Sequence, residues 1–473
     1  MKKTLISLIL TFCFLSSIVF AAEQRTIDIA KLSIKDAVDL AILGNYTLKS
    51  QREQLLEAIA AKRVALNLSN PSVSTSLTKG SNAGVTSNAY NASFNLIQDL
   101  NTGDNLTVTN TAFTGSGNGS QLLYNQFSVV YTKPLLKNGG LAAGNYNIAT
   151  ADNNLKTQSL TYEISRQNII ELTFLAFYDI IKNKQQILVN EEAVKLAEES
   201  YRIASRKLEE GLATSIDVTR SETTLANAQG NLISAQKSWK KARDLLAVLI
   251  GLTPEDMLDI DYVYVYKPGD RILDDAALIK EALEKRMNLL KLKIELDQAY
   301  TSVKYYKNQY MPNLNLVTSY NTNPDSSNYG ISQSYLLPTW SINLNSTYFL
   351  RDFADEENFK KSERLVVLKK DDIASTQRVV EEEVRSSIRG IFSAYSQVNV
   401  NTKNVKAAEL SLYAANRRWE EGIADNRDVM DAQQSLTQAR TRFYAAQIDY
   451  LISKVALFKN IGVDLYEYLQ KEL

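Results

Sequence analysis

The 473 residues include 53 basic and 53 acidic side chains, so the sequence shows no net positive charge that would favour a nucleic-acid partner. There is no histidine, and the single cysteine is Cys13. The commonest general base and the usual soft-metal ligands are therefore missing. Phosphate-binding and dinucleotide-binding motifs are also lacking. We expect a protein that is not an enzyme and that has no cofactor and no resident metal.

Residues 1–21 predict a cleaved secretory signal peptide. Lys2 and Lys3 precede an apolar run, a small-residue cleavage site ends at Ala21, and polar sequence begins at Glu23. The run is short for a bilayer span, and an uncleaved anchor is the alternative. Cleavage removes Cys13, so the mature chain is expected to have neither a disulfide nor a lipid. No later stretch is apolar enough for a transmembrane helix, so a membrane-inserted mature protein must be a β-barrel.

An internal duplication organises the rest of the chain. Shifting the sequence by 211 residues places 180–251 on 391–462 without a gap, and 24 of the 72 positions are identical. The earlier part of each half aligns at an offset of 241, which puts Pro71 on Pro312. The first half therefore carries 30 extra residues, which we place within 79–121. We predict a first repeat over 22–251, a linker over 252–278 and a second repeat over 279–473.

Each repeat predicts one very long helix, a glycine turn and a second helix. The long helices are expected from about Leu141 to Glu210 and from about Phe353 to Glu421, each roughly 100 Å long at 1.5 Å per residue. Large apolar residues recur every seven positions, beside a second seam of small residues. The large seams contain Ile180, Ile187, Val194, Tyr201 and Leu208, and Ile391, Val398, Val405, Leu412 and Trp419. Helices with two seams can close into a cylinder, whereas an antiparallel bundle is the alternative.

Alternating segments between the helices predict strands. In 340–348 the apolar residues share one face while Ser, Asn and Thr share the other, and 72–78, 90–96 and 313–316 show similar alternation. An uncharged polar face opposite an apolar face is typical of outer-membrane strands, with a soluble sandwich as the alternative. We expect two strands at about 71–136 and two at about 312–350. Because closed outer-membrane barrels begin at eight strands, four per chain predict a homo-oligomer, and three subunits would give twelve strands.

The two turns share a pattern. Gly211 and Gly422 fit the left-handed position that ends a helix. Asp217 and Asp428 fit the start of the next helix, where a carboxylate can accept hydrogen bonds from free backbone N–H groups.

With the duplication, these turns and the Lys133–Leu136 strand exit, the chain resembles the TolC family of outer membrane efflux proteins over nearly the whole mature sequence. The resemblance implies a homotrimer with a twelve-stranded β-barrel continuous with a twelve-helix periplasmic α-barrel, plus a small equatorial domain. It also implies an outer membrane exit duct of a tripartite drug-efflux pump or a type I secretion system. The partners would be a periplasmic adaptor (membrane fusion) protein and an inner-membrane transporter of the resistance-nodulation-division, ABC or major-facilitator type.

By the same resemblance, Asp428 and Asp431 correspond to an acidic pair at the periplasmic constriction. Such a ring would favour cations and could bind a blocking polyvalent ion, while simple helix capping is the alternative. Trp419 matches an aromatic gate position, but the basic gate residue falls on Ala424, for which Arg427 could substitute. Arg220 stands where the second repeat has Asp431 and could pair with the acidic ring.

The turn tips are candidate contacts for the adaptor, with a solvated loop as the alternative. The candidate residues are Gly211, Leu212, Ala213, Thr214, Asp217, Gly422, Ile423 and Ala424. A periplasmic coiled-coil scaffold without a channel would share the heptads. It would not need uncharged alternating strands.

Overall fold

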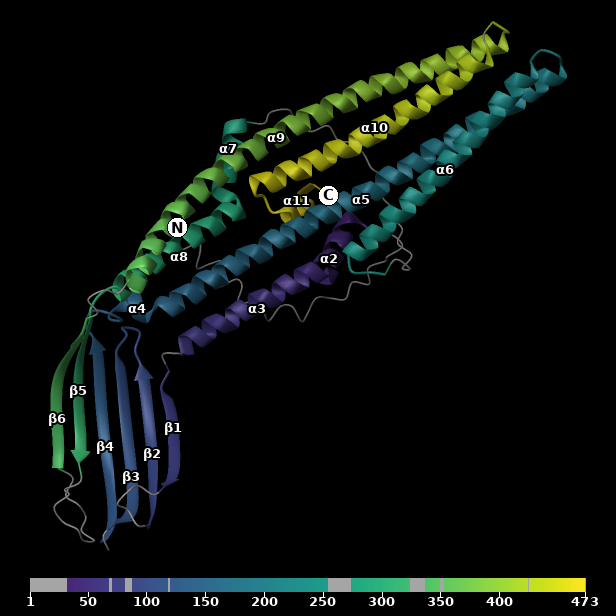
Figure 1. Cartoon of the computed structure of the whole chain (residues 1–473). Coiled ribbons are helices and arrows are strands. Elements are labelled where there is room, and N and C mark those ends of the chain that lie inside the picture. Colours follow the sequence, from purple (N-terminus) through teal and green to yellow (C-terminus); the bar gives the residue numbers. More distant parts are fainter. Residues whose placement is uncertain are drawn as a thin grey trace. The chain divides into compact units, whose positions relative to one another are not determined.

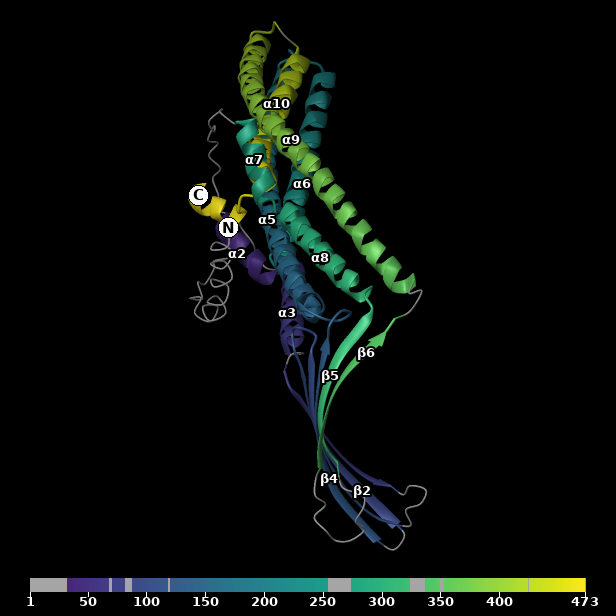
Figure 2. The same cartoon turned by 90° about the vertical axis from the view of Figure 1, so that its left-hand side faces the viewer.

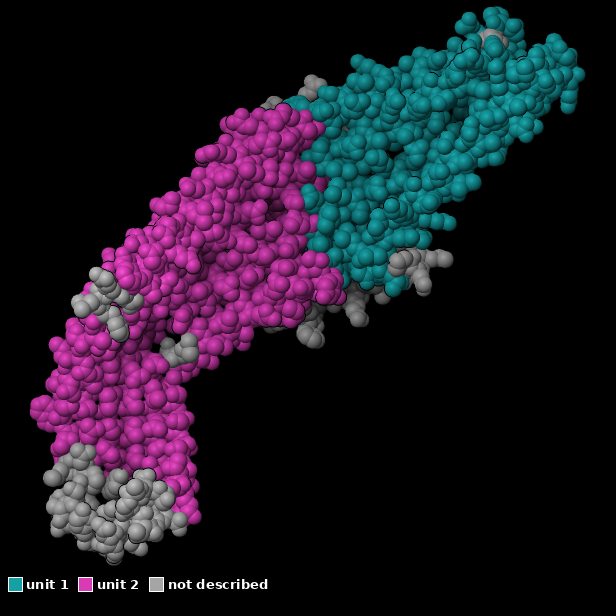
Figure 3. Space-filling view, in the orientation of Figure 1, with its two compact units in different colours: residues 1–45, 169–270, 392–453 teal, residues 46–168, 271–391, 454–473 magenta. Residues whose placement is uncertain are grey.

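The computed structural model describes residues 32–67, 70–80, 87–117, 120–253, 274–323, 337–348, 353–423 and 425–472. The predicted signal peptide and most of the predicted linker lie outside these residues. The described chain forms two compact units, residues 1–45, 169–270 and 392–453 and residues 46–168, 271–391 and 454–473 (Figure 3). Each unit takes segments from both predicted repeats, so the units do not coincide with the repeats.

Helices form most of the described chain. The earlier ones are α2 (Ile34–Gly44), α3 (Tyr46–Asn67), α4 (Leu141–Gly144), α5 (Tyr146–Glu209), α6 (Ser215–Leu249) and α7 (Asp275–Lys285). The later ones are α8 (Met287–Gln309), α9 (Phe353–Glu420), α10 (Asn426–Ile461) and α11 (Leu465–Glu472). The two long helices follow their predicted bounds closely, but α7 begins inside the segment that we assigned to the linker. Among the described residues, no helix is both long enough and apolar enough to cross a membrane.

The sheet has six strands where the sequence predicted four. They are β1 (Ser72–Gly80), β2 (Ser87–Asp99), β3 (Asn105–Gly117), β4 (Ser120–Pro134), β5 (Asn313–Asn323) and β6 (Leu337–Thr347). All neighbours are antiparallel, in the order β1-β2-β3-β4-β5-β6 (Figure 1). The first half therefore supplies four strands instead of the predicted two. Three chains with this sheet would have more than the twelve strands that the sequence predicted.

The register places most of the apolar side chains of the six strands on one face. Paired residues on antiparallel strands point to the same side of a sheet. Following the pairs from Val73 through Leu96, Val108, Val129 and Tyr320 to Trp340 traces one continuous apolar face. Several of its members are exposed, including Leu77, Phe94, Phe127, Trp340, Ile342 and Leu344. The opposite face carries mainly Ser, Thr and Asn.

In the unit that holds the sheet, four helices lie side by side in the order α3, α5, α8 and α9. Lys62 of α3 contacts Asp152 of α5 at 2.5 Å. Asn153 of α5 donates to Gln298 of α8 at 3.0 Å, and Lys369 of α9 contacts Glu295 of α8 at 2.8 Å. Figure 2 shows β5 continuing directly from α8. An apolar core of Ala282, Leu289, Val380, Val384, Ile388, Leu457 and Ile461 joins α7, α8, α9 and the end of α10.

The other unit contains two helical hairpins, α5–α6 and α9–α10, and in each hairpin an asparagine links the two helices. The Asn190 side chain donates to the Asn231 carbonyl at 3.4 Å, and the Asn401 side chain donates to the Arg442 carbonyl at 3.2 Å. The two asparagines lie 211 residues apart. Equivalent sequence thus makes an equivalent contact in both hairpins.

Candidate functional site

Both hairpins end in the same helix-terminating turn. Gly211 and Gly422 adopt positive φ angles of 72° and 73°, which glycine tolerates without steric cost. Leu212 N–H donates to the Lys207 carbonyl at 2.7 Å, and Ile423 N–H donates to the Arg418 carbonyl at 2.8 Å. These bonds, with those from each glycine to the carbonyl three residues earlier, define a Schellman motif. The predicted left-handed glycine position is therefore confirmed at both turns.

At the first turn, Asp217 takes part in capping α6. Thr214 is the N-cap of α6, and its side chain accepts a hydrogen bond from the Asp217 N–H. The Asp217 carboxylate in turn accepts from the Thr214 backbone N–H at 2.9 Å, which completes a capping box. Hydrogen bonds from the Thr214 side chain and backbone hold the pKa of Asp217 below its ordinary value of 3.8. This geometry agrees with the position at the start of a helix that the sequence predicted for Asp217.

The second turn exposes both of its candidate carboxylates. Asp428 lies in the first turn of α10, with its N–H bonded to the Asp425 carbonyl at 3.0 Å. Asp431 is three residues further on, and both side chains are exposed. Arg427 contacts Asp431 at 3.8 Å across one helical turn. Because both partners are largely exposed, this pair contributes little to stability. Ala424 lies outside the described residues.

Trp419 is 7% exposed and is held by a residue that the sequence reasoning missed. The Lys207 Nζ donates to the Trp419 carbonyl at 2.7 Å and lies 4.5 Å from the centre of its ring. Among the described residues, Lys207 of α5 is the basic side chain recorded against Trp419, whereas Arg427 contacts Asp431. Around Trp419 lie Leu412, Val429, Ala432 and Leu436, with Leu196 and Ile203 of α5 against them. The indole thus packs between the two hairpins.

Further polar side chains join the hairpins through α10. The Asn426 amide is buried and donates to Ser221 of α6 at 2.7 Å, while Gln433 donates to Ser200 of α5 at 2.8 Å. Arg440 contacts Glu192 of α5 at 2.5 Å and Glu409 of α9 at 3.0 Å. Burial alone would lower the pKa of Arg440. Its hydrogen bonds to Glu192 and Glu409 outweigh this effect and raise the pKa above its ordinary value. None of these contacts is visible in a heptad pattern, which reports only the apolar seams.

Arg220 lies on α6, beside a hollow that Met430 of α10 also lines. It borders a surface hollow between α6 and α10 with Ser215, Ile216, Thr219, Thr223, Thr224 and Met430. Its charge helps to lower the pKa of Asp217. No ion pair joins Arg220 to Asp428 or Asp431 among the described residues. Over the same residues, no group of three or more acidic, histidine or cysteine side chains could bind a metal ion.

The tips themselves present apolar side chains to solvent. Leu212 is 73% exposed and Ile423 is 67% exposed, at equivalent positions of the two turns. Ile216, in the first turn of α6, is also largely exposed. Large aliphatic groups kept in water at both tips are typical of a contact surface for another protein.

Comparison with known proteins gives a consistent match. Residues 278–463 match the family described as "Outer membrane efflux protein". The chain is 24% identical over 329 residues to the outer membrane protein TolC of Escherichia coli K12, covering 64% of this chain and 63% of TolC. It is 23% identical to the toluene efflux pump outer membrane protein TtgC of Pseudomonas putida, covering 62% and 60%. The match thus spans less than two thirds of these relatives' length.

Solved structures share the fold over almost the whole chain. The chain matches a crystal structure of CusC with a TM-score of 0.69 at 13% identity, and the match covers 94% of this chain and 96% of CusC. The CusC structures concern conformational changes that accompany folding and transmembrane channel formation. The outer membrane protein VceC of Vibrio cholerae also has a TM-score of 0.69, at 14% identity, with 91% and 96% covered.

Proposed function

We propose, from the premise that this chain is TolC-like in sequence and in fold, that it is an outer membrane exit duct. It conducts substrates passively from the periplasm to the exterior, as part of a tripartite efflux pump or a type I secretion system. Copies of the chain form a homotrimer, and its partners are a periplasmic adaptor and an inner-membrane transporter. The helix tips form the periplasmic entrance, and no chemical step is required.

One observation carries this proposal, namely the exposed apolar face of the sheet. Trp340 is 77% exposed and Leu77 is 76% exposed, and they lie on opposite edge strands of one continuous face. A soluble protein would bury a face of this size, whereas lipid can cover it. The opposite face carries mainly Ser, Thr and Asn, with Asp99 at the end of β2 as its acidic residue, and such a polar face is expected for a water-filled lumen. A periplasmic coiled-coil scaffold offers no reason for either face.

We assign the gate to Asp428 and Asp431, which are exposed; the cationic contact recorded for them among the described residues is that of Arg427 with Asp431 at 3.8 Å. Brought together from several copies, such carboxylates would attract polyvalent cations. In planar lipid bilayers, we expect the variant with Asp428→Ala and Asp431→Ala to bind a blocking trivalent cation at least tenfold more weakly. Asp425→Ala is the matched control, because Asp425 is an exposed acid in the same turn. Unchanged block in the double variant would refute the gate assignment.

We assign adaptor docking to the tips that carry Leu212 and Ile423. The mature chain is expected to have no cysteine, so Ala213→Cys introduces a unique thiol beside Leu212. We expect a bifunctional crosslinker at this thiol to capture the adaptor in intact cells. Ser234→Cys, on the exposed side of α6, is the control that should capture none. Equal capture from both positions, or none from Ala213→Cys, would contradict docking at the tip.

A further inference from the structure

Within the described residues, the six-stranded sheet has two open edges, β1 and β6. Every residue of β1 is exposed. The edges also lack the usual features that prevent edge pairing: the only charge in β1 is Lys79, next to its last residue, and the only proline in β6 is Pro338, its second residue. Open strand edges are not tolerated where a sheet faces lipid, because their backbone groups would have no hydrogen-bond partner. Each edge therefore requires another strand.

The pair β2–β3 accounts for the extra residues of the first half. β1 and β5 begin 241 residues apart, at Ser72 and Asn313, as do α3 and α8. The ends of β4 and β6 lie close to the other offset of 211. β1 and β4 are thus the counterparts of β5 and β6, and residues 87–117 form an inserted strand pair within the first hairpin. The insertion changes the strand number without changing the number of long helices.

The inserted pair is an integral part of the sheet. β2 pairs with β1 from Ile97 to Ala89, and β3 pairs with β4 along its whole length. The turn between β2 and β3 is also fixed at the helical end of the sheet, where Gly140 N–H donates to the Thr102 carbonyl at 2.8 Å. A side chain at Gly103, whose φ is 85°, would come within 2.1 Å of the Asn138 carbonyl oxygen. Tyr131 donates to Asp104 at 2.7 Å.

A second copy of the chain fits the open edges. Because the six strands alternate in direction, β1 and β6 run oppositely, so β6 of one copy can lie antiparallel to β1 of the next and keep the alternation. The apolar face then continues from Trp340 to Val73 of the neighbour without a break. Six strands are too few to close within one chain, since outer-membrane barrels begin at eight. Head-to-tail pairing of β6 of each copy with β1 of the next generates a ring when the rotation between copies closes.

We propose that β1 pairs with β6 of a neighbouring copy and that three copies close a barrel of eighteen strands, six from each chain. This inference rests on the exit duct and homotrimer proposed above. Barrel diameter grows approximately linearly with strand number, so the lumen is roughly 1.5 times as wide as that of a twelve-stranded barrel. The insertion β2–β3 thus widens the membrane passage while each chain still supplies two helical hairpins.

Disulfide trapping tests the edge pairing. Within one sheet Ser72 lies level with Ser341, and barrel closure adds a stagger of about one residue per strand, or roughly six per copy. This stagger places Ser76 opposite Asn343 of the neighbour. We therefore combine Ser76→Cys with each of Thr339→Cys, Ser341→Cys, Asn343→Cys and Asn345→Cys. Oxidation should give covalent trimers, most efficiently with Asn343→Cys.

The matched control keeps the same first cysteine. The hydroxyl oxygens of Ser76 and Ser93 are 2.7 Å apart within one chain, so Ser76→Cys with Ser93→Cys should give only intrachain disulfides and monomers. If the control oxidises and none of the four β6 combinations crosslinks between chains, the edge pairing is wrong.

A cryo-electron microscopy map of the full mature chain in detergent then counts the strands. Three copies with eighteen strands are expected. Three copies with twelve strands and β2–β3 outside the ring would overturn the inference. Two copies with twelve strands would also overturn it. Either of these barrels would still agree with the proposed exit duct. A protein that stays monomeric and never enters the membrane fraction would contradict the proposed function itself.

Discussion

Lys207 is a charged residue that links the second tip to α5, and the sequence did not identify it. Its ammonium group binds the Trp419 carbonyl and lies over the indole ring, so that it fixes the end of α9 to α5. The same carbonyl also accepts the hydrogen bond from Gly422 N–H that closes the turn. Trp419 was recognisable from its place three residues before the glycine. Its partner was not, because contacts between hairpins depend on how the helices face each other and not on spacing along one helix.

We expect Lys207→Met to loosen the second tip. A hydrogen bond to a charged donor contributes about 1.5–3 kcal/mol and a cation–π contact about 0.5–1 kcal/mol, so the local opening free energy should fall by about 2 kcal/mol. Hydrogen exchange at Gly422 and Ile423 should then be roughly 30-fold faster. Lys182→Met is the matched control, since Lys182 is more exposed and contacts Asp449 only at 3.7 Å. Unaltered exchange in Lys207→Met would show that the lysine is not a structural link.

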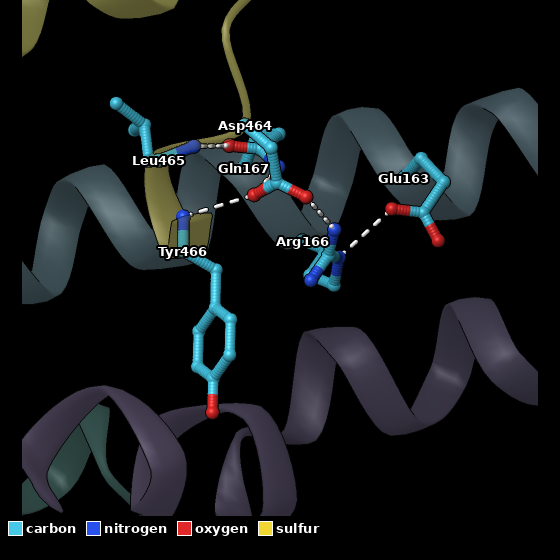
Figure 4. A network of polar contacts seen from close by, with 6 residues as sticks. All are labelled: Glu163, Arg166, Gln167, Asp464, Leu465 and Tyr466. Carbon is cyan, nitrogen blue, oxygen red and sulfur yellow. Dashed lines mark hydrogen bonds and ion pairs between the residues drawn. The ribbon is translucent and has the colours of Figure 1, made fainter. Parts of the chain in front are cut away.

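At the scale of elements, Asp464 is the centre of a polar network at the start of α11. Asp464 precedes α11 and accepts hydrogen bonds from the Gln167 side chain at 2.8 Å and the Tyr466 N–H at 2.9 Å (Figure 4). Arg166 of α5, which also contacts Glu163, pairs with Asp464 at 2.7 Å. Gln167 also accepts from Leu465 N–H at 3.0 Å. This network connects the start of α11 to α5.

We expect the docking of α11 to depend on pH. Burial alone would raise the pKa of Asp464, but the hydrogen bonds from Gln167 and Tyr466 and the charge of Arg166 outweigh it and lower the pKa below 3.8. A depressed carboxyl pKa stabilises the folded form above the unfolded value, and this contribution is lost as pH falls through the folded pKa. Proteolysis of the C-terminal segment should therefore accelerate below about pH 4. Asp464→Asn should be cleaved faster at neutral pH, with a weaker pH response; a response equal to that of the parent chain would exclude Asp464 as its source.

The sequence predicted helices and turns better than strands. Heptads sustained over many turns placed the long helices α5 and α9 within a few residues and predicted a further helix after each, and glycine chemistry identified both turns. Strand β3 was missed because it is rich in Thr, Asn and Gly, whose alternation is weak. Its partner β2 was seen only in part. In a membrane barrel, lipid rather than a protein core selects the outward residues, so each strand carries little signal.

At the scale of the whole molecule, the apolar surface exceeds what one chain can bury. Besides the sheet face, α9 exposes Leu410 and Tyr413 and α6 exposes Ile233, each above 60%. Large apolar residues on long helices that have no covering partner are typical of surfaces buried in an assembly. The open sheet edges make the same demand in hydrogen bonds. A homotrimeric duct satisfies both with copies of one chain.

Single-channel recording tests the central claim most directly. The full mature protein, purified in detergent and added to a planar lipid bilayer, should insert and produce discrete, long-lived conductance steps, because the proposed assembly encloses a continuous water-filled passage. Current should fall when a trivalent cation is added on the side that holds the helix tips. Insertion verified by recovery of the protein from the bilayer lipid, without any conductance above that of the detergent alone, would contradict the account.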